Sequence, residues 1–207
     1  DLVLEPSAGT GVLAIFAQVA GTRLALNELA ETRRALLKEL FPAATVSDHD
    51  AASIDDRLDR SITPSVIVMN PPFSAANHVE GKFRQATSQH VLSALARLSP
   101  GGRLVVITGE SFRPSTKSFQ STFQRIAHSA DVVFSAAIDG KVFARHGTAI
   151  DTRLTVIDKR AAGVEETAPG DIEAAYHPIC ATTGDLLSAV LTYCPERRSP
   201  SSSPTTS

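Results

Sequence analysis

The stretch Leu2-Val3-Leu4-Glu5-Pro6-Ser7-Ala8-Gly9-Thr10-Gly11 decides the fold. It places a short apolar run before a turn that contains two glycines, and a helical pattern of apolar residues follows. Gly9 and Gly11 lack a Cβ atom, so a turn at these positions can lie flat against a ligand and adopt positive φ angles. The exposed amides at the start of the next helix would suit a carboxylate. The stretch therefore predicts a strand, a ligand-binding turn and a helix.

Further along the chain, apolar runs alternate with helical spacing, which is typical of a parallel sheet flanked by helices on both faces. The link between the last two expected strands, 139–151, is short enough for an antiparallel hairpin. The run 66–69 is apolar at every position, so we expect this strand to be buried on both faces. Strands are expected at 2–4, 23–26, 44–47, 66–69, 103–108, 132–138 and 153–158. The expected buried stripes of the first two helices are Val12, Leu13, Ile15, Phe16 and Val19, and Leu29, Leu36, Leu37 and Leu40.

Composition indicates one catalytic domain. The 207 residues are 43% hydrophobic, enough for one sizeable core. We place this domain at 1–160, and we expect it to be truncated at its N-terminus because the chain begins at Asp1 inside an apparent strand. Residues 161–194 have weak periodicity and predict a weakly structured extension. Pro, Ser, Thr and Arg dominate 195–207, so a disordered tail is expected there.

Charge and cysteine content limit the possible partners. The net charge of −2 gives little general attraction for nucleic acid, so the domain alone should bind a polyanion weakly. Cys180 and Cys194 lack the paired spacing of a zinc or redox site, and the six histidines are scattered, so no metal site is predicted. These features, and the lack of a long apolar stretch, favour a reduced, cytoplasmic protein without a membrane span.

A second informative stretch is Asn70-Pro71-Pro72-Phe73, directly after the expected strand 66–69. The side-chain oxygen of Asn70 and the carbonyl of Pro71 are two acceptors beside the flat ring of Phe73. Such a group can receive a planar amine, and the prolines stiffen the direction of the carbonyl. Two acceptors that draw on the hydrogens of an amine localise its lone pair, while an aromatic ring can stack on the substrate. The stretch therefore predicts chemistry at an exocyclic or amide nitrogen.

Both stretches resemble motifs of a known enzyme class. Residues 1–11 and 70–73 look like motifs I and IV of the amino-methyltransferases that include the DNA adenine-N6 enzymes. The amino-acid sequence at 26–33, 64–74 and 134–159 resembles the methyltransferase region of bacterial strawberry-notch-type proteins, in which that region accompanies a helicase-like region. This chain has no Walker motif of its own. The resemblance implies a Rossmann-like, seven-stranded sheet with an antiparallel last strand, and S-adenosylmethionine (AdoMet) as cofactor.

The cofactor site implied by these patterns consists of the turn and of acids at strand ends. Glu28 follows the second strand, where a carboxylate can accept ribose hydroxyls. In the family that the chain resembles, Asp50 would reach the adenine amino group, and Asp48 competes for this role. The third glycine of a dinucleotide turn is replaced by Ala14, which weakens a nicotinamide interpretation. The full predicted set is Glu5, Pro6, Ser7, Gly9, Gly11, Glu28 and Asp50, with Asn70, Pro71, Pro72 and Phe73 as the catalytic group.

The expected function is AdoMet-dependent N-methylation, with DNA adenine-N6 favoured over RNA. The alternatives are guanine-N2 methylation of ribosomal RNA, glutamine methylation of a protein, and a degenerate methyltransferase fold kept as an interaction module beside a helicase. The segment 141–147, with Lys141 and Arg145 around Phe143, is a candidate lip for nucleic acid or another substrate, but a solvated hairpin tip is the favoured interpretation.

Overall fold

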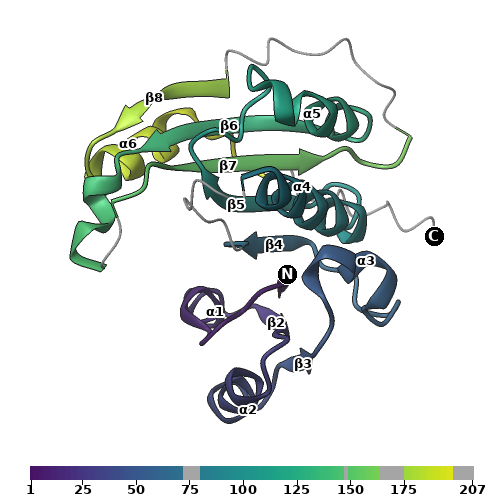
Figure 1. The fold of residues 1–207 in the computed structure, drawn as a ribbon. Helices are drawn as coiled ribbons and strands as arrows, with labels where there is room; N and C mark the ends of the chain where they lie inside the picture. The colour runs from purple at the N-terminus through teal and green to yellow at the C-terminus, as the bar shows by residue number, and fades with distance from the viewer. Residues whose placement is uncertain (72–79, 147–148, 164–174, 198–207) are drawn as a thin grey trace, which may run out of the picture.

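The computed structural model of the chain describes residues 1–71, 80–146, 149–163 and 175–197. These residues form one sheet in the order β3-β2-β1-β4-β5-β7-β6-β8, with helices on both faces (Figure 1). The strands are β1 (Leu2–Glu5), β2 (Arg23–Asn27), β3 (Thr45–Ser47), β4 (Val66–Met69), β5 (Arg103–Gly109), β6 (Ala130–Ile138), β7 (Thr152–Lys159) and β8 (Tyr176–Cys180). The helices are α1 (Val12–Val19), α2 (Glu31–Leu40), α3 (Ile54–Arg57), α4 (Glu80–Arg97), α5 (Gln120–Ala127) and α6 (Thr183–Tyr193), with 3-10 turns η1 (Ala51–Ser53), η2 (Lys117–Phe119) and η3 (Gly140–His146).

The strand directions confirm the predicted α/β class. β1 pairs in parallel with β2 and β4, and the parallel pairing extends to β3 on one side and β5 on the other. β7 lies between β5 and β6 and runs antiparallel to both, as expected for a hairpin over 139–151. The first seven strands therefore have the expected arrangement. β8 adds an eighth strand, parallel to β6.

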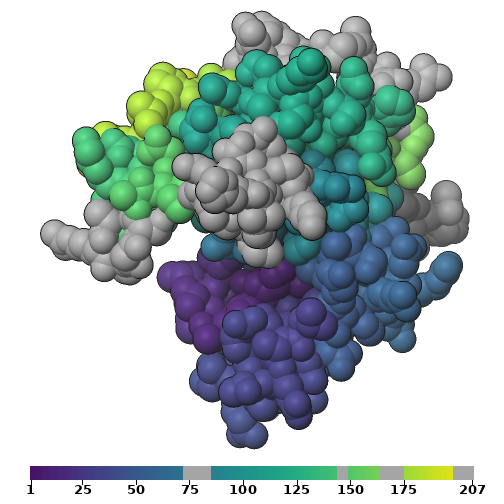
Figure 2. All heavy atoms as spheres, viewed as in Figure 1, coloured from purple at the N-terminus to yellow at the C-terminus, as the bar shows by residue number. Residues whose placement is uncertain are grey.

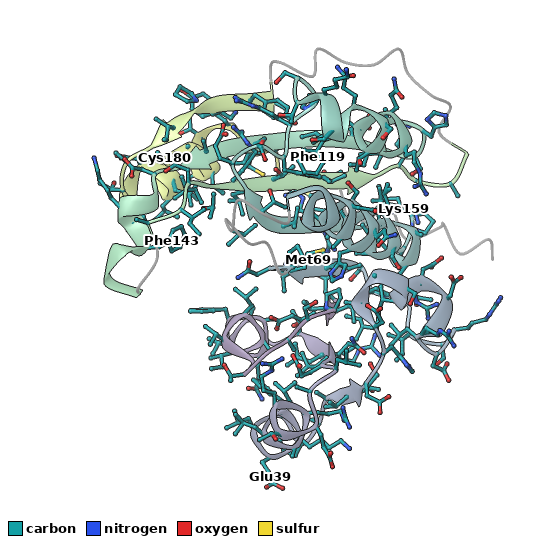
Figure 3. The ribbon with its side chains drawn as sticks, in the orientation of Figure 1. Glu39, Met69, Phe119, Phe143, Lys159 and Cys180 are labelled. Atoms are coloured by element: carbon teal, nitrogen blue, oxygen red, sulfur yellow. The ribbon has the colours of Figure 1, made fainter. Side chains whose placement is uncertain are left out.

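Two layers of side chains cover the sheet. On one face, α3, α4 and α5 bury a continuous core, in which Ile67, Met69 and Leu104 are at most 1% exposed. Met69 lies in this core near the centre of the molecule (Figure 3). On the other face, α1 and α2 cover β1 and β2, and α6 covers β6 and β7 through a separate cluster.

The predicted buried stripe of α1 is wrong. Val12 is 61% exposed, and Ile15, Phe16 and Val19 are also exposed, whereas Ala14 is buried. The helix is apolar on nearly every side, so periodicity alone could not select its inner face. Small side chains at the contact let the helix lie close to β1 and β2. In the second helix, Leu37 is buried as predicted, while Leu36 and Leu40 are exposed, as is Leu29, which precedes the helix.

The prediction that β4 is buried on both faces is also wrong. Ile67 and Met69 are buried beneath α4, but Val66 and Val68 on the opposite face are only half-buried. β5 repeats this pattern, with Leu104 and Val106 buried on the α4 face and the alternate positions half-buried. β4 and β5 therefore lie between the areas covered by α1 and by α6.

The C-terminal region is more ordered than the sequence suggested. Within 161–194, predicted to be weakly structured, β8 pairs with β6 and α6 packs on the sheet. α6 begins with a capping box: the Thr182 hydroxyl accepts a hydrogen bond from the Asp185 amide at 3.0 Å, and the Asp185 carboxylate accepts one from the Thr182 amide at 2.9 Å. The edge position of β8 tolerates Pro178, which had obscured the strand.

The start of the predicted disordered tail is ordered as well. Arg197 forms a bidentate ion pair with Asp1, at 2.6 and 2.8 Å, and Arg103 donates to the Pro195 carbonyl at 2.9 Å. Positions 198–207 lie outside the described residues. The tail prediction is therefore corrected for 195–197, because backbone and charge contacts fix these residues to the sheet edge.

Lys159 fixes the end of α4. Its Nζ donates to the carbonyls of Leu95, Ala96 and Leu98 at 2.7 to 3.0 Å, which satisfies backbone acceptors at the helix C-terminus (Figure 3). Burial lowers the pKa of Lys159. In the described part of the chain, none of the helices is both long and apolar enough to cross a bilayer.

Candidate functional site

The turn after β1 contains two glycines with different roles. Both adopt left-handed φ angles, 56° for Gly9 and 84° for Gly11. A Cβ atom on Gly11 would come within 2.5 Å of the Phe41 ring and 2.9 Å of Leu37, so packing against α2 requires glycine there. A Cβ on Gly9 would meet nothing within 4 Å. Gly11 is thus a packing requirement, while Gly9 borders open space that a ligand can approach.

Glu28 fastens this turn to the end of β2. Its Oε2 accepts from the Gly9 amide at 2.9 Å, and its Oε1 accepts from the Ala30 amide and Arg33 Nη2, both at 2.8 Å. Burial alone would raise the pKa of Glu28, but the hydrogen bonds from Arg33, Ala30 and Gly9 together lower it. A carboxylate has about four acceptor directions. One direction on Oε2 therefore stays available for a ligand hydroxyl.

Asn27, which the sequence analysis missed, links the loops after β1 and β3. Its Nδ2 donates to the carbonyls of Pro6 and His49 at 2.9 and 2.8 Å. Its Oδ1 accepts from the Ser47 hydroxyl at 2.8 Å and from the His49 amide at 2.9 Å. The side chain is 1% exposed and all four of its hydrogen-bonding positions are used. The signal in the sequence was that Asn27 is a polar residue at the end of an apolar run.

Glu5, at the end of β1, is a buried carboxyl group with an unused acceptor. The residue is 3% exposed, and its Oε2 has no hydrogen-bond partner among the described residues. Burial raises the pKa of Glu5 to about 8, with the backbone N–H of Ala14 counteracting part of the shift. A buried carboxylate oxygen without a donor is costly. A cationic donor placed here would stabilise the ionised form.

The two acids after β3 have different surroundings. Asp48 lies 3.8 Å from the Arg34 guanidinium of α2, at Oδ2. Asp50 caps η1, because its Oδ1 accepts from the Ala52 amide at 2.9 Å. Both side chains are exposed. Burial lowers the pKa of His90 in α4, and the charge of Asp50 counteracts part of this shift.

Asn70 and the glycine turn meet at the same edge of the sheet. β1 and β4 are parallel neighbours, with Leu4 paired to Ile67, so their carboxyl ends lie side by side. The chain continues from β1 towards β2 and from β4 towards β5 on opposite sides of this pair, which makes it the topological switch point. Ligands of open α/β sheets bind in the crevice at such a point.

The catalytic group is only partly described. Asn70 is exposed and Pro71 is buried, while Pro72 and Phe73 lie outside the described residues. In the turn after β1, Pro6 is buried and Ser7 is half-buried. The structure thus brings Glu5, Pro6, Ser7, Gly9, Gly11 and Glu28 together, with Asn70 at the adjacent strand end.

η3 also lies at the carboxyl edge of the sheet, because it follows β6, which runs parallel to β5. Lys141 is an exposed residue of η3 whose Nζ lies 3.9 Å from Asp139, and the side chain of Arg145 is outside the described residues. Where side chains are described, no three His, Cys, Asp or Glu residues gather as a metal site would require.

Comparison with known proteins identifies the family. The methyltransferase small domain family matches residues 2–132, which include the glycine turn, Glu28 and Asn70. The chain belongs to the methyltransferase small domain family. Its fold is that of class I AdoMet-dependent methyltransferases. No curated protein matches the sequence.

Solved structures show the same fold. A putative class I AdoMet-dependent methyltransferase from Listeria monocytogenes superposes with a TM-score of 0.69 at 13% identity, over 94% of this chain and 64% of that one. A modification subunit of a putative type I restriction enzyme from Vibrio vulnificus superposes with a TM-score of 0.58 at 15% identity, over 84% of this chain and 46% of that one. A putative RNA methyltransferase from Pyrococcus horikoshii superposes with a TM-score of 0.54 at 17% identity, over 77% of this chain and 74% of that one. The chain thus spans less than two thirds of the first two proteins.

The described residues fit AdoMet chemically. Its methionine part carries an ammonium and a carboxylate, and its nucleoside carries ribose hydroxyls. Glu5 offers the unpaired carboxylate oxygen, Glu28 the spare acceptor direction, and Gly9 the open space beside the N-terminus of α1. These three features lie on one turn and the strand ends beside it.

Proposed function

We propose that the chain is an N-methyltransferase acting on an exocyclic amino group of a nucleic-acid base, with adenine N6 in DNA as the first candidate. The observation that carries the proposal is the position of Asn70. It follows β4 at the switch point, beside the turn after β1, and its side chain is exposed. An acceptor in this position is open to a substrate and adjacent to the cofactor turn.

The proposed chemistry follows from the weak nucleophilicity of such an amine. Its lone pair is delocalised into the ring, so it attacks poorly while it stays planar. The side-chain oxygen of Asn70 and the carbonyl of Pro71 accept its two hydrogens and orient the lone pair. Phe73 stacks on the base and offsets part of the cost of flipping it out of a duplex. AdoMet supplies the electrophilic methyl group.

On the cofactor side, each contact is assigned from the local geometry. Glu5 accepts the ammonium of the methionine part, because its Oε2 has no donor among the described residues. The first amides of α1 receive the carboxylate, and Glu28 accepts a ribose hydroxyl through Oε2. Asp50 is assigned to the adenine amino group in preference to Asp48, which faces Arg34.

The substrate assignment rests on the motif. The structural relatives include both a modification subunit of a putative type I restriction enzyme and a putative RNA methyltransferase, so they favour neither DNA nor RNA. The resemblance of 134–159 to strawberry-notch-type proteins adds the proposal that the chain works beside a helicase-like region, in the same protein or in a partner.

The test is methyl transfer from labelled AdoMet to separate pools of DNA, RNA and protein, followed by hydrolysis and identification of the methylated product. The full-length protein and residues 1–207 are assayed in parallel. We expect N6-methyladenine from DNA. Methylated guanine N2 from RNA, or methylated glutamine from protein, would reassign the substrate. Absence of transfer by the full-length protein to any pool, with AdoMet bound, would indicate a non-catalytic module.

A further inference from the structure

Positive charge is concentrated in one continuous part of the chain. Residues 80–130 contain seven Lys and Arg residues and two acids, a net charge of +5 in a chain whose total is −2. The other residues therefore carry −7. This segment forms α4, β5, η2 and α5, and its two long helices lie side by side on one face of the sheet (Figure 1).

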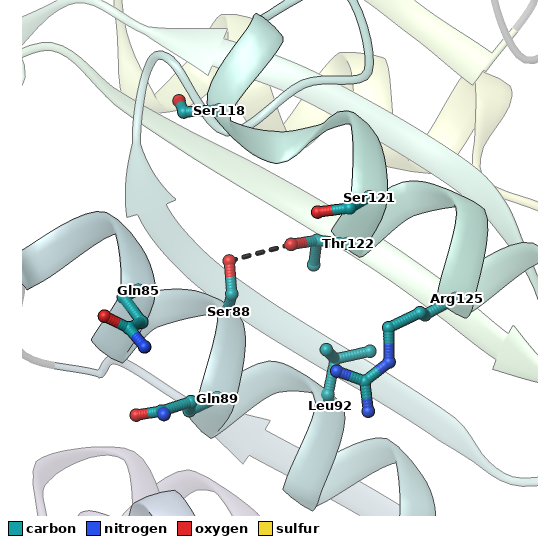
Figure 4. A pocket seen from close by; sticks show the side chains of 8 residues that line it. All are labelled: Gln85, Ser88, Gln89, Leu92, Ser118, Ser121, Thr122 and Arg125. Atoms are coloured by element: carbon teal, nitrogen blue, oxygen red, sulfur yellow. Dashed lines mark hydrogen bonds between the residues drawn. The ribbon is translucent and has the colours of Figure 1, made fainter. Parts of the chain in front are cut away.

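A polar groove runs between these two helices. Its volume is about 390 Å³, and Figure 4 shows the side chains that line it. Ser88 of α4 and Thr122 of α5 meet across the groove, where the Thr122 hydroxyl donates to Ser88 Oγ at 2.8 Å. Gln85 and Gln89 line the α4 side, and Arg125 lies on the α5 side. Apart from Leu92, every lining residue is polar, and none is acidic.

The side chains that line the groove favour an anionic ligand. Amides, hydroxyls and a guanidinium all donate hydrogen bonds, and a groove without carboxylates has nothing to repel a negative group. Arg125 forms no ion pair with any described residue, and Lys117, next to the lining residue Ser118, is likewise unpaired there. The planar guanidinium matches two oxygens of a phosphate.

The groove begins near the start of α4, at Gln85, and extends to Arg125 in the last turn of α5. α4 and α5 each follow a parallel strand, so their N-termini lie near the sheet edge that carries Asn70. Gln85 is about 8 Å along α4 from its first residue. The acidic N-terminal part occupies the opposite end of the molecule in the space-filling view (Figure 2).

We propose that the α4–α5 groove binds the phosphodiester backbone of the nucleic-acid substrate. The inference rests on the proposed function for its substrate class and adds the surface that holds it. Arg125 and Lys117 contact phosphates, and the amides and hydroxyls of the groove complete the contact. Such contacts position a strand without reading its sequence.

The test compares two double variants of the full chain that remove the same charge. Lys117→Gln/Arg125→Gln alters the groove, and Lys38→Gln/Arg60→Gln alters exposed residues elsewhere. Fluorescence anisotropy measures binding of labelled single-stranded DNA, duplex DNA and RNA over a range of salt concentrations, with polyglutamate as a competitor without phosphate. Equal thermal melting of the variants checks folding, and AdoMet titration checks the cofactor site.

The groove variant should bind every oligonucleotide at least about fivefold more weakly, with a salt slope reduced by about one to two. The control variant should stay within about twofold of wild type. The preferred oligonucleotide identifies the type of nucleic acid. Wild-type affinity and slope in the groove variant, absence of oligonucleotide binding by wild type, or equal competition by polyglutamate would overturn the proposal. The binding assay does not require methyl transfer. Its result can therefore be interpreted even if the methylation assay fails.

Discussion

The proposed cofactor half and the proposed amine-binding half of the site are built in opposite ways. Around the turn after β1, Glu5, Asn27 and Glu28 are each at most 5% exposed, and hydrogen bonds hold the loops together. After β4, Asn70 is exposed at the end of a strand. The residues proposed to contact the cofactor also hold the loops together, whereas Asn70 is proposed to serve the substrate. Substitutions should therefore separate the two halves.

The largest effect is expected at Gly11. Gly11→Val places a branched side chain at a φ of 84° and against Phe41 and Leu37, which should destabilise the protein by about 2–5 kcal/mol and abolish AdoMet binding. Gly9→Ala is the matched change, because it meets only open space and should cost about 1–2 kcal/mol. Urea unfolding measures both. Equal stability of the two variants would contradict the different roles of the glycines.

A smaller effect is expected at Glu28. Glu28→Gln removes the charge that accepts from Gly9, Ala30 and Arg33, and should raise the Kd for AdoMet about 10- to 100-fold. The control is Glu31→Gln, the same change at an exposed residue of the first turn of α2. Calorimetric titration gives both constants. A Kd within twofold of wild type for Glu28→Gln would remove Glu28 from the cofactor site.

The third effect is a pH dependence caused by Glu5. Its pKa is raised to about 8 by burial, so the folded state favours the protonated form. The contribution of protonated Glu5 to the free energy of unfolding is fully present below the ordinary carboxyl pKa and is lost as the pH rises to about 8. Without cofactor, the free energy of unfolding should fall by about 1 kcal/mol per pH unit in this window.

Glu5→Gln serves as the reference for this dependence. It should give a flatter profile, because glutamine does not titrate. Saturating AdoMet should reduce the decline in wild type, because its ammonium would stabilise the ionised carboxylate. Chemical denaturation at pH 5, 6, 7 and 8 tests the assignment, and identical profiles for wild type and Glu5→Gln would refute it.

The positions of the first seven strands were predictable because these strands leave apolar runs and the turns carry glycine or proline, whereas the arrangement of the sheet followed from the family resemblance. The inner face of α1 was not predictable, because residues 12–19 are apolar on nearly every side and the contact depends on the small Ala14. β8 and α6 escaped notice because an edge strand with Pro178 and a helix with exposed Leu187 and Leu191 have weak periodicity.

For the site, motif spacing located the turn, Glu28 and Asn70 correctly at one sheet edge. Asn27 was missed because its side chain bridges backbone groups of the loops after β1 and β3, and these come together only in the folded chain. The α4–α5 groove was not predicted for a related reason. Its lining residues come from separate segments, 85–92 and 118–125, which only folding brings together.

The most direct test of the division between the two halves is Asn70→Ala, assayed in single turnover with the full-length protein and its identified substrate. AdoMet affinity should stay within about twofold of wild type while the rate of methyl transfer falls about 100- to 1000-fold, because the lost interaction acts on the transition state. Asn70→Asp, which keeps an acceptor oxygen, should retain part of the rate. A wild-type rate in Asn70→Ala, or a loss of AdoMet binding equal to the loss of rate, would contradict the account.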